Sequence, residues 1–122
     1  MKRDVVAGVT QEVGRYLVGR KLDVRTGSEL WEFPGGKIEA DETVEDAVCR
    51  EWLEELGVEI KKYRGLIAVL ENDQYRIHFC AVDIKGTPKA LEHEELAWME
   101  PGRLSQLTMH SLDSDLVLNY LV

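Results

Sequence analysis

The sequence predicts an α+β fold, an α/β/α sandwich in which a mixed β-sheet packs between helices. Three observations lead to this prediction: β-prone runs occupy both halves of the chain, one amphipathic helical pattern lies between them, and an apolar helical pattern closes the sequence. The length of 122 residues and the hydrophobic fraction of 44% are typical of one globular domain, spanning residues 1–122.

The first part of the chain contains predicted strands and loops. Residues 4–10 (DVVAGVT) and 16–21 (YLVGRK) are β-prone runs separated by the turn-like QEVG, which predicts an early hairpin. A polar loop then leads to a short apolar run at residues 30–33. Pro34, Gly35 and Gly36 follow, and we expect them to interrupt regular structure and to let the backbone approach a ligand closely.

The central helix is the most clearly marked element. Thr43 followed by Asp46 resembles a capping box, and Gly57 is the kind of residue that ends a helix at its C-terminus. Between these ends, apolar residues recur at helical spacing: Val44, Ala47, Val48, Trp52 and Leu56. The pattern therefore predicts a helix between Thr43 and Gly57.

The second part of the chain returns to strands. Residues 63–71 (YRGLIAVLE) and 75–84 (YRIHFCAVDI) are β-prone and are joined by the turn-prone NDQ. Residues 95–99 (ELAWM) predict a short strand, and residues 114–122 (SDLVLNYLV) predict a final helix. Strands on both sides of a central helix favour the sandwich.

Charge and composition exclude several classes of protein. A net charge of −8 and a pI near 4.9 argue against binding to a nucleic-acid polymer. No apolar run approaches the roughly 20 residues of a membrane span, and charges interrupt the N-terminus too early for a signal peptide, so we expect a cytoplasmic protein without membrane contact. Cys49 and Cys80 predict buried free thiols, and the three histidines show no ligand spacing and are assigned no part in the chemistry.

Residues 33–58 gather eight acidic side chains and only two basic ones. On a helix, Glu51, Glu54 and Glu55 stand at i, i+3 and i+4 and project from one side, where like charges repel. One interpretation is a solvated acidic face, softened by Arg50 and Lys61. The other is a site for a hard divalent cation such as Mg²⁺, toward which the neighbouring glycine turn also directs its backbone groups.

A family resemblance decides between these interpretations. Residues 36–58 match the Nudix box at every fixed position: Gly36, Glu42, Arg50, Glu51, the apolar Trp52, Glu54, Glu55, Gly57 and Val58. The preceding WEFPGGKIE resembles the MutT-like branch of the Nudix hydrolase family, which comprises small nucleoside triphosphate pyrophosphohydrolases. The resemblance implies the Nudix-type α/β/α sandwich and favours a metal site over a solvated face.

The resemblance also implies a set of metal ligands. Nudix hydrolases use Mg²⁺ or Mn²⁺ to polarise a diphosphate, and a metal-associated water is the nucleophile. The matching metal ligands are Glu51, Glu54 and Glu55, with the carbonyl of Gly35 or Gly36. In MutT-like enzymes a further acidic residue reaches the metals from a loop before the penultimate strand, and its distance from Trp98 favours Glu92 over Glu94 and Glu95.

Two further residues of the box are expected to support the glutamates. Arg50 resembles the residue that orients them, and Glu42 is its expected partner. Glu54 is a candidate general base, because the group that accepts the proton of the water varies within the family.

The substrate-binding residues are expected outside the box. Arg20, Lys21 and Lys37 are candidates for binding phosphate, with a solvent-facing role as the alternative for each. Asp113 lies where related sequences place the residue that reads the base. An ionised carboxylate accepts hydrogen bonds and suits the amine of cytosine, whereas a protonated one can also read 8-oxo-guanine. Tyr75 and Phe79 are candidates for stacking on the base, although aromatic residues on strands more often belong to the core.

The expected reaction converts a (deoxy)nucleoside triphosphate to the monophosphate and pyrophosphate, with CTP, dCTP or a modified nucleotide such as 8-oxo-dGTP as the substrate. One alternative is hydrolysis of another nucleoside diphosphate derivative: ADP-ribose, a nucleotide sugar or a dinucleoside polyphosphate. A non-catalytic nucleotide-binding module is a further alternative, but no box glutamate is lost. The small-molecule nucleotide is the expected partner, and the protein is expected to be a monomer or a homodimer.

Overall fold

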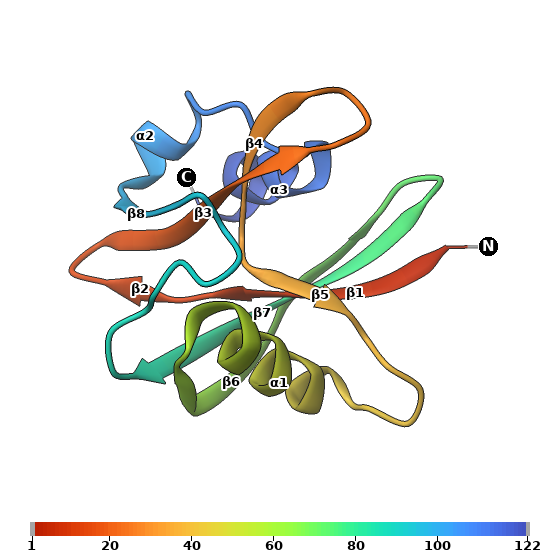
Figure 1. The fold of residues 1–122 in the computed structure, drawn as a ribbon, viewed down its shortest axis with the longest axis vertical. Helices are drawn as coiled ribbons and strands as arrows, with labels where there is room; N and C mark the ends of the chain where they lie inside the picture. Colours follow the sequence, from red (N-terminus) through yellow and green to blue (C-terminus); the bar gives the residue numbers. More distant parts are fainter. Residues whose placement is uncertain (1, 122) are drawn as a thin grey trace.

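The computed structural model describes residues 2–121, which form two β-sheets and flanking helices (Figure 1). The first sheet has the strand order β5 (Gly35–Lys37), β1 (Arg3–Val9), β7 (Tyr75–Lys85) and β6 (Glu59–Glu71). Strand β1 runs parallel to β7 and antiparallel to β5, so this sheet is mixed, as predicted.

The second sheet is antiparallel and was not foreseen as a separate sheet. It contains β2 (Gln11–Glu12), β3 (Arg15–Asp23), β4 (Ser28–Glu32) and β8 (Glu95–Met99), with β4 and β8 both paired to β3. Because β5 and β7 occupy both edges of β1, β1 has no free edge for β3. The predicted early hairpin is therefore confined to β2 and β3, which turn at Val13 and Gly14.

Helices cover both faces of the first sheet. On one face, α1 (Val44–Leu56) buries Ala47, Val48, Trp52 and Leu56 against a cluster that includes Val6, Cys80 and Val82. On the other face, α3 (Ser111–Leu116) and the π-helix η1 (Val117–Leu121) pack on a cluster that includes Ala7, Val9 and Phe79. Side chains alternate between the faces of a strand, so β1 and β7 supply both clusters. This arrangement confirms the α/β/α sandwich.

The ends of α1 follow the sequence prediction. The Thr43 hydroxyl accepts a hydrogen bond from the Asp46 backbone N–H at 3.0 Å, and the Asp46 carboxylate accepts one from the Thr43 N–H at 3.3 Å. Gly57 adopts a left-handed conformation with φ of 65° and donates its N–H to the Leu53 carbonyl. These caps fix which residues lie on the exposed side of the helix.

Other boundaries differ from the sequence prediction. Gly35 and Gly36 lie in β5 instead of interrupting regular structure, because β5 passes close to β1 and a Cβ atom at Gly35 would collide with the Val6 carbonyl oxygen. Strand β6 begins four residues earlier than predicted, and a short helix, α2 (Pro101–Leu104), was not predicted. The final helical segment begins at Ser111, three residues earlier than predicted, and the predicted end at Val122 lies outside the described residues.

Two further sequence expectations concern the thiols and the membrane. Cys49 and Cys80 are both free, with Cys80 buried and Cys49 half-buried. Among residues 2–121, no helix is long and apolar enough to cross a lipid bilayer.

Candidate active site

Helix α1 presents the three predicted carboxylates at different depths. Glu55 is buried, Glu51 is half-buried and Glu54 is exposed. Trp52, which is fully buried, donates its indole Nε1–H to the Pro34 carbonyl at 2.8 Å and so ties the helix to the segment just before β5. The helix and the strand β5 are therefore held together at the point where the cation site was expected.

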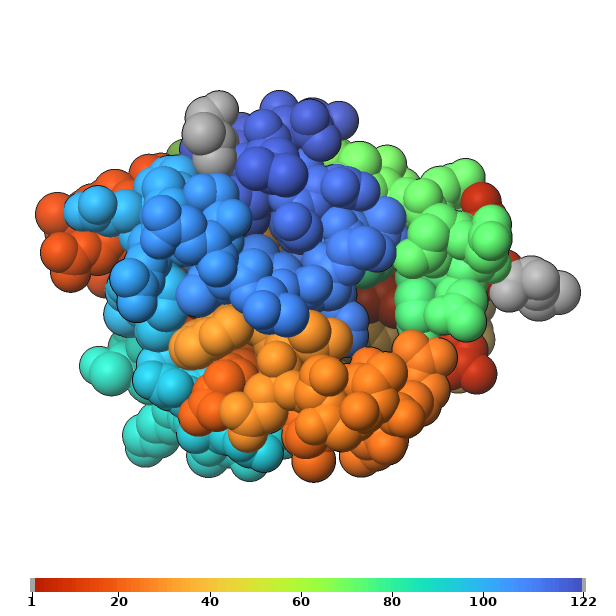
Figure 2. Space-filling model, turned by 90° about the horizontal axis from the view of Figure 1, so that it is seen from above, coloured from red at the N-terminus to blue at the C-terminus, as the bar shows by residue number. Residues whose placement is uncertain are grey.

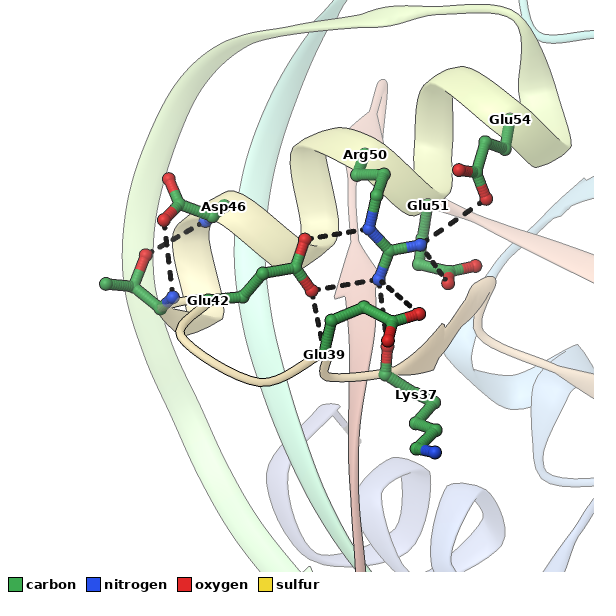
Figure 3. Close-up of polar contacts among 8 residues, drawn as sticks. Lys37, Glu39, Glu42, Asp46, Arg50, Glu51 and Glu54 are labelled. Atoms are coloured by element: carbon green, nitrogen blue, oxygen red, sulfur yellow. Dashed lines mark hydrogen bonds and ion pairs between the residues drawn. The ribbon is translucent and has the colours of Figure 1, made fainter.

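Arg50 connects the carboxylates to the loop before the helix (Figure 3). Its Nε and Nη2 atoms donate to the two Glu42 carboxylate oxygens at 2.7 and 2.9 Å. Its Nη1 atom donates to Glu51 at 2.8 Å and to Glu54 at 3.4 Å, and Nη2 also reaches the Lys37 carbonyl at 3.0 Å. The expected pairing of Arg50 with Glu42 is present, and one guanidinium holds three carboxylates.

The pairing of Arg50 with Glu42 keeps both of these groups ionised. Hydrogen bonds from Arg50 and from the Glu39 backbone N–H lower the pKa of Glu42 to about 2, and the hydrogen bond to Glu42 raises the pKa of Arg50. A bidentate guanidinium–carboxylate pair of this kind fixes the geometry of both groups. Arg50 is therefore held in one orientation relative to Glu51 and Glu54.

Gly36 leaves room for the Glu51 carboxylate. A Cβ atom at position 36 would lie 2.5 Å from Glu51 Oε2, so any larger residue would displace this carboxylate. The backbone of β5 and the Glu51 side chain are consequently in direct apposition. The arrangement brings together two of the predicted metal-binding groups.

The third box glutamate lies in a buried polar cluster. Glu55, Glu32 and His93 place one donor atom each within 4.8 Å of one another, which makes the cluster a candidate metal site. Burial raises the pKa of Glu55 to about 9, a hydrogen bond to Glu51 adds to this effect, and the positive charge of Lys21 opposes it. Glu55 Oε1 has no hydrogen-bond partner among the described residues.

Sequence reasoning missed two members of this cluster. Glu32 precedes the Phe33-Pro34-Gly35 segment, and His93 directly follows Glu92, the residue chosen from the same loop. In the structure Glu92 is exposed and His93 is buried against Glu32 and Glu55. No local pattern marks either residue, because their approach to Glu55 depends on the pairing of β3 with β4 and β8.

A pocket adjoins the cluster. A cavity of about 360 Å³ is lined by β1, by the end of β4, by the β6–β7 turn and by the start of α3. Figure 2 shows it as a hollow between the orange β4 region, the green β6–β7 turn and the blue C-terminal segment. Glu32 and Gly35 line the pocket, so it shares a wall with the carboxylates.

The pocket contains two of the three predicted base-binding residues. Tyr75 and Asp113 line it, whereas Phe79 is fully buried and offers no exposed face for stacking. Phe79 instead packs edge-to-face on Phe33, which lines the pocket, with ring centroids 6.2 Å apart. The Asp113 Oδ2 atom accepts the Phe33 backbone N–H at 2.9 Å, and burial raises the pKa of Asp113 to about 8.

The predicted phosphate-binding residues are divided. Arg20 and Lys21 are adjacent on β3 and so point to opposite faces of the strand. Arg20 is paired with Glu29 and, at 3.2 Å, with Glu95, while Lys21 lies close enough to influence the pKa of Glu55. Lys37 is exposed, and its side chain points away from Arg50 in Figure 3.

Comparison with known proteins shows the family of the chain and agrees with the fold. The family model of the NUDIX domain matches residues 1–120, and the chain belongs to the Nudix hydrolase family. It resembles the MutT-like members: the crystal structure of a MutT NUDIX hydrolase from Burkholderia pseudomallei superposes with a TM-score of 0.84, at 28% identity, over 100% of this chain and 99% of that chain.

Several relatives have named activities. A CTP pyrophosphohydrolase of Escherichia coli (strain K12) is 33% identical over 118 residues, which cover 93% of this chain and 87% of the relative. An 8-oxo-dGTP diphosphatase of Proteus vulgaris is 44% identical over 45 residues, or 37% of this chain and 39% of the relative.

Proposed function

We propose that the protein hydrolyses a (deoxy)nucleoside triphosphate to the monophosphate and pyrophosphate with the help of Mg²⁺. One observation carries the proposal: Glu32 lines the pocket and also lies beside Glu55 of α1, so a base in the pocket directs its phosphates toward the carboxylates of α1. The pocket volume of about 360 Å³ lies within the range of small-molecule sites and suits a nucleoside.

The donor groups fit a hard divalent cation. Glu51, Glu54, Glu55 and the carbonyl of Gly36 supply oxygen atoms, which Mg²⁺ prefers and Mn²⁺ also accepts. Glu55 Oε1 is buried and unpartnered among the described residues, as expected for an atom whose partner is an ion. When bound, the metal supplies charge neutralisation of the phosphates and lowers the pKa of a coordinated water.

The protein residues take complementary parts in the reaction. Arg50 orients Glu51 and Glu54 through the hydrogen bonds described above. Glu54 is exposed beside the guanidinium and is our candidate for accepting the proton of the attacking water. Lys21 and Lys37 are our candidates for contacting phosphate oxygens. Arg20 is not among them, because its guanidinium is already paired with Glu29 and Glu95.

Asp113 is proposed to read the base. At neutral pH a carboxyl group with a pKa of about 8 is mostly protonated, so its Oδ1 can donate a hydrogen bond while Oδ2 accepts from Phe33. A protonated Asp113 can donate a hydrogen bond to a carbonyl group of the base. The preference for the cytosine amine, which an ionised Asp113 would give, is therefore removed. CTP and 8-oxo-dGTP are therefore both candidate substrates, and the activities named for the two relatives fall in the same class.

A nucleotide panel tests the proposal. CTP, dCTP, 5-methyl-dCTP, dGTP, 8-oxo-dGTP, dATP, ADP-ribose and a dinucleoside polyphosphate would each be incubated with the protein and Mg²⁺, and the products separated by chromatography. We expect one triphosphate to give monophosphate and pyrophosphate with a far higher kcat/KM than the others. Turnover of ADP-ribose or the dinucleoside alone would contradict the substrate, and tight calorimetric binding without any turnover would contradict the activity.

A further inference from the structure

We propose that Glu32, Glu55 and His93 form a nitrogen-containing metal position that binds a divalent first-row transition ion such as Mn²⁺ in preference to Mg²⁺. The proposal deepens the proposed function, because Glu55 is shared with the proposed Mg²⁺ site. It can nevertheless be tested without a nucleotide. It assigns a ligand role to a histidine and to a glutamate outside the Nudix box.

The donor atoms lie close to the separations that a shared ion requires. His93 Nε2 is hydrogen-bonded to Glu32 Oε2 at 3.0 Å, a contact that a shared ion would replace, and it lies 3.8 Å from Glu55 Oε1. Nitrogen and oxygen ligands bind divalent ions at about 2.0–2.2 Å, so neighbouring ligands of one ion lie about 3.0–3.5 Å apart. Small side-chain rotations would bring all three atoms onto one ion, since they already lie within 4.8 Å of one another.

Burial points to a ligand at this position. The side chain of His93 is fully buried and that of Glu55 is 4% exposed, yet Glu55 Oε1 has no hydrogen-bond partner among residues 2–121. A buried, unpaired carboxylate oxygen is costly, and a cation would satisfy it. Glu32 is 18% exposed and lines the nucleoside-sized pocket, which gives an ion a path to the cluster.

Packing holds the imidazole in place. The His93 ring lies directly over Gly19 in β3, where a Cβ atom would collide with its ring carbons. His93 Nδ1 has no hydrogen-bond partner among the described residues, so the ring is oriented by its close contact with Gly19 and by the hydrogen bond between Nε2 and Glu32. This orientation presents Nε2 to both carboxylates.

The donor chemistry selects the kind of ion. Mg²⁺ prefers oxygen ligands alone and dehydrates reluctantly. An imidazole nitrogen favours the later divalent ions of the first transition row, while two carboxylates keep Mn²⁺ within the range of suitable ions. An all-oxygen site on α1 and a mixed position at His93 would therefore differ in metal preference.

Electron spin echo spectroscopy of bound Mn²⁺ in the nucleotide-free protein tests the inference directly. With Mn²⁺ raised stepwise beyond one equivalent, we expect nitrogen coupling from an imidazole ligand. Spectra with oxygen ligands only would overturn the proposal. This measurement uses the wild-type protein, so it does not depend on the folding of any variant.

Three substitutions assign the nitrogen. His93→Gln should abolish the coupling and weaken Mn²⁺ binding at least tenfold, while Mg²⁺ binding changes little. His78→Gln is the matched control, because His78 bonds to Asp4 on the first sheet and should keep the coupling. His110 lies 3.6 Å from Glu32, so coupling that persists in His93→Gln but disappears in His110→Gln would overturn the assignment.

The two proposals can fail separately. Mg²⁺-dependent turnover of a nucleoside triphosphate by a protein whose Mn²⁺ shows no nitrogen coupling would overturn the metal position at His93 alone. Nitrogen coupling in a protein that turns over no nucleotide would support the metal position and overturn only the proposed reaction.

Discussion

Arg50 is the residue on which the geometry of the carboxylates depends. Its guanidinium contacts Glu42, Glu51, Glu54 and the Lys37 carbonyl, and these groups come from β5, the following loop and α1. A lysine could carry the charge but offers a single ammonium group in place of a planar fork. The position therefore requires the shape of arginine as well as its charge.

We predict that Arg50→Lys lowers metal affinity or activity by about 10–100-fold, because residues that orient metal ligands typically contribute that much. Calorimetric titration with Mn²⁺ in the absence of nucleotide checks the effect. Arg64→Lys is the control, since Arg64 makes a similar bidentate pair with Asp83 on β6 and β7. Equal losses in the two variants would show that Arg50 acts through general stability.

Asp113 should make stability depend on pH. Burial raises its pKa from 3.8 to about 8, so the folded protein retains a proton that the unfolded chain releases. The resulting stabilisation is fully present below the unfolded pKa and is lost as the pH rises through the folded pKa. For one proton the slope is at most about 1.4 kcal/mol per pH unit.

Asp113→Asn mimics the protonated side chain and should remove this dependence. We therefore expect the variant to gain stability relative to the wild type as the pH rises from about 4 to about 8, measured by urea unfolding. Asp115→Asn, on the exposed side of α3, should follow the wild type at each pH. Parallel curves for Asp113→Asn and the wild type would refute the assigned protonation.

The sequence predicted the box residues but only part of their surroundings. Fixed spacing on one helix was enough to place Glu51, Glu54 and Glu55, because helical geometry is local. The approach of Glu32 and His93 to Glu55 was not predictable in this way. It arises from the pairing of β3 with β4 and β8, which joins residues far apart in the chain.

At the scale of elements, β5 makes a structural contact with β1 at Gly35 and faces the Glu51 carboxylate at Gly36. Gly35 lies against the β1 backbone, where nothing can move aside, and Gly36 lies against the end of a flexible glutamate side chain. The two adjacent glycines therefore have different structural roles. Alanine substitutions at the two positions should have different effects on stability and on metal binding.

Gly35→Ala should destabilise the protein by about 1–3 kcal/mol or more, because its Cβ would collide with the backbone of Val6. Gly36→Ala should unfold near the wild-type temperature but bind metal weakly, since its Cβ displaces Glu51. Thermal unfolding and Mn²⁺ titration of both variants check the prediction. A normal metal affinity in Gly36→Ala would contradict the placement of Glu51.

The β2–β3 turn is a local weakness of the second sheet. Val13 is almost fully exposed and has φ of 52°, a left-handed conformation that β-branched residues tolerate poorly. Asparagine is preferred before glycine in a two-residue hairpin turn. The Val13 side chain is exposed, so the packing of the sheet does not require valine at this position.

Val13→Asn should raise the stability by about 1 kcal/mol through relief of this conformation. The gain is measured as an increase in Tm, with activity unchanged. Val24→Asn removes a similarly exposed valine that lacks a positive φ, and it should leave the Tm nearly unchanged. An equal increase in both variants would attribute the gain to the loss of an exposed apolar side chain.

Local signals explain which elements were predictable. Helix α1 was predicted because its caps and its apolar spacing lie within a short segment. The division into two sheets depends on the approach of β5 and β7 to β1, which no local pattern encodes. The strand at Gly35 and Gly36 was hidden for a related reason, since its stability comes from the contact with β1 and glycine has a low strand propensity.

At the scale of the whole molecule, the sandwich brings an acidic helix and a pocket to adjoining parts of one sheet. Helix α1 covers one face of the first sheet and α3 covers the other, and the paired strands β1 and β5 pass between them (Figure 1). The net charge of −8 would repel a triphosphate, so a cation at the carboxylates is needed to bind it. The proposed reaction therefore depends on the proposed metal site of α1.

The most direct test compares kcat/KM and Mg²⁺ binding for glutamate variants of α1, with the preferred nucleoside triphosphate as substrate. We predict that Glu51→Gln, Glu54→Gln and Glu55→Gln each lose more than about 100-fold, since loss of an outer-shell partner alone costs 10–100-fold. Glu45→Gln, an exposed acidic residue in the first turn of the same helix, should retain full activity. Wild-type activity in the Glu54 and Glu55 variants would contradict the account.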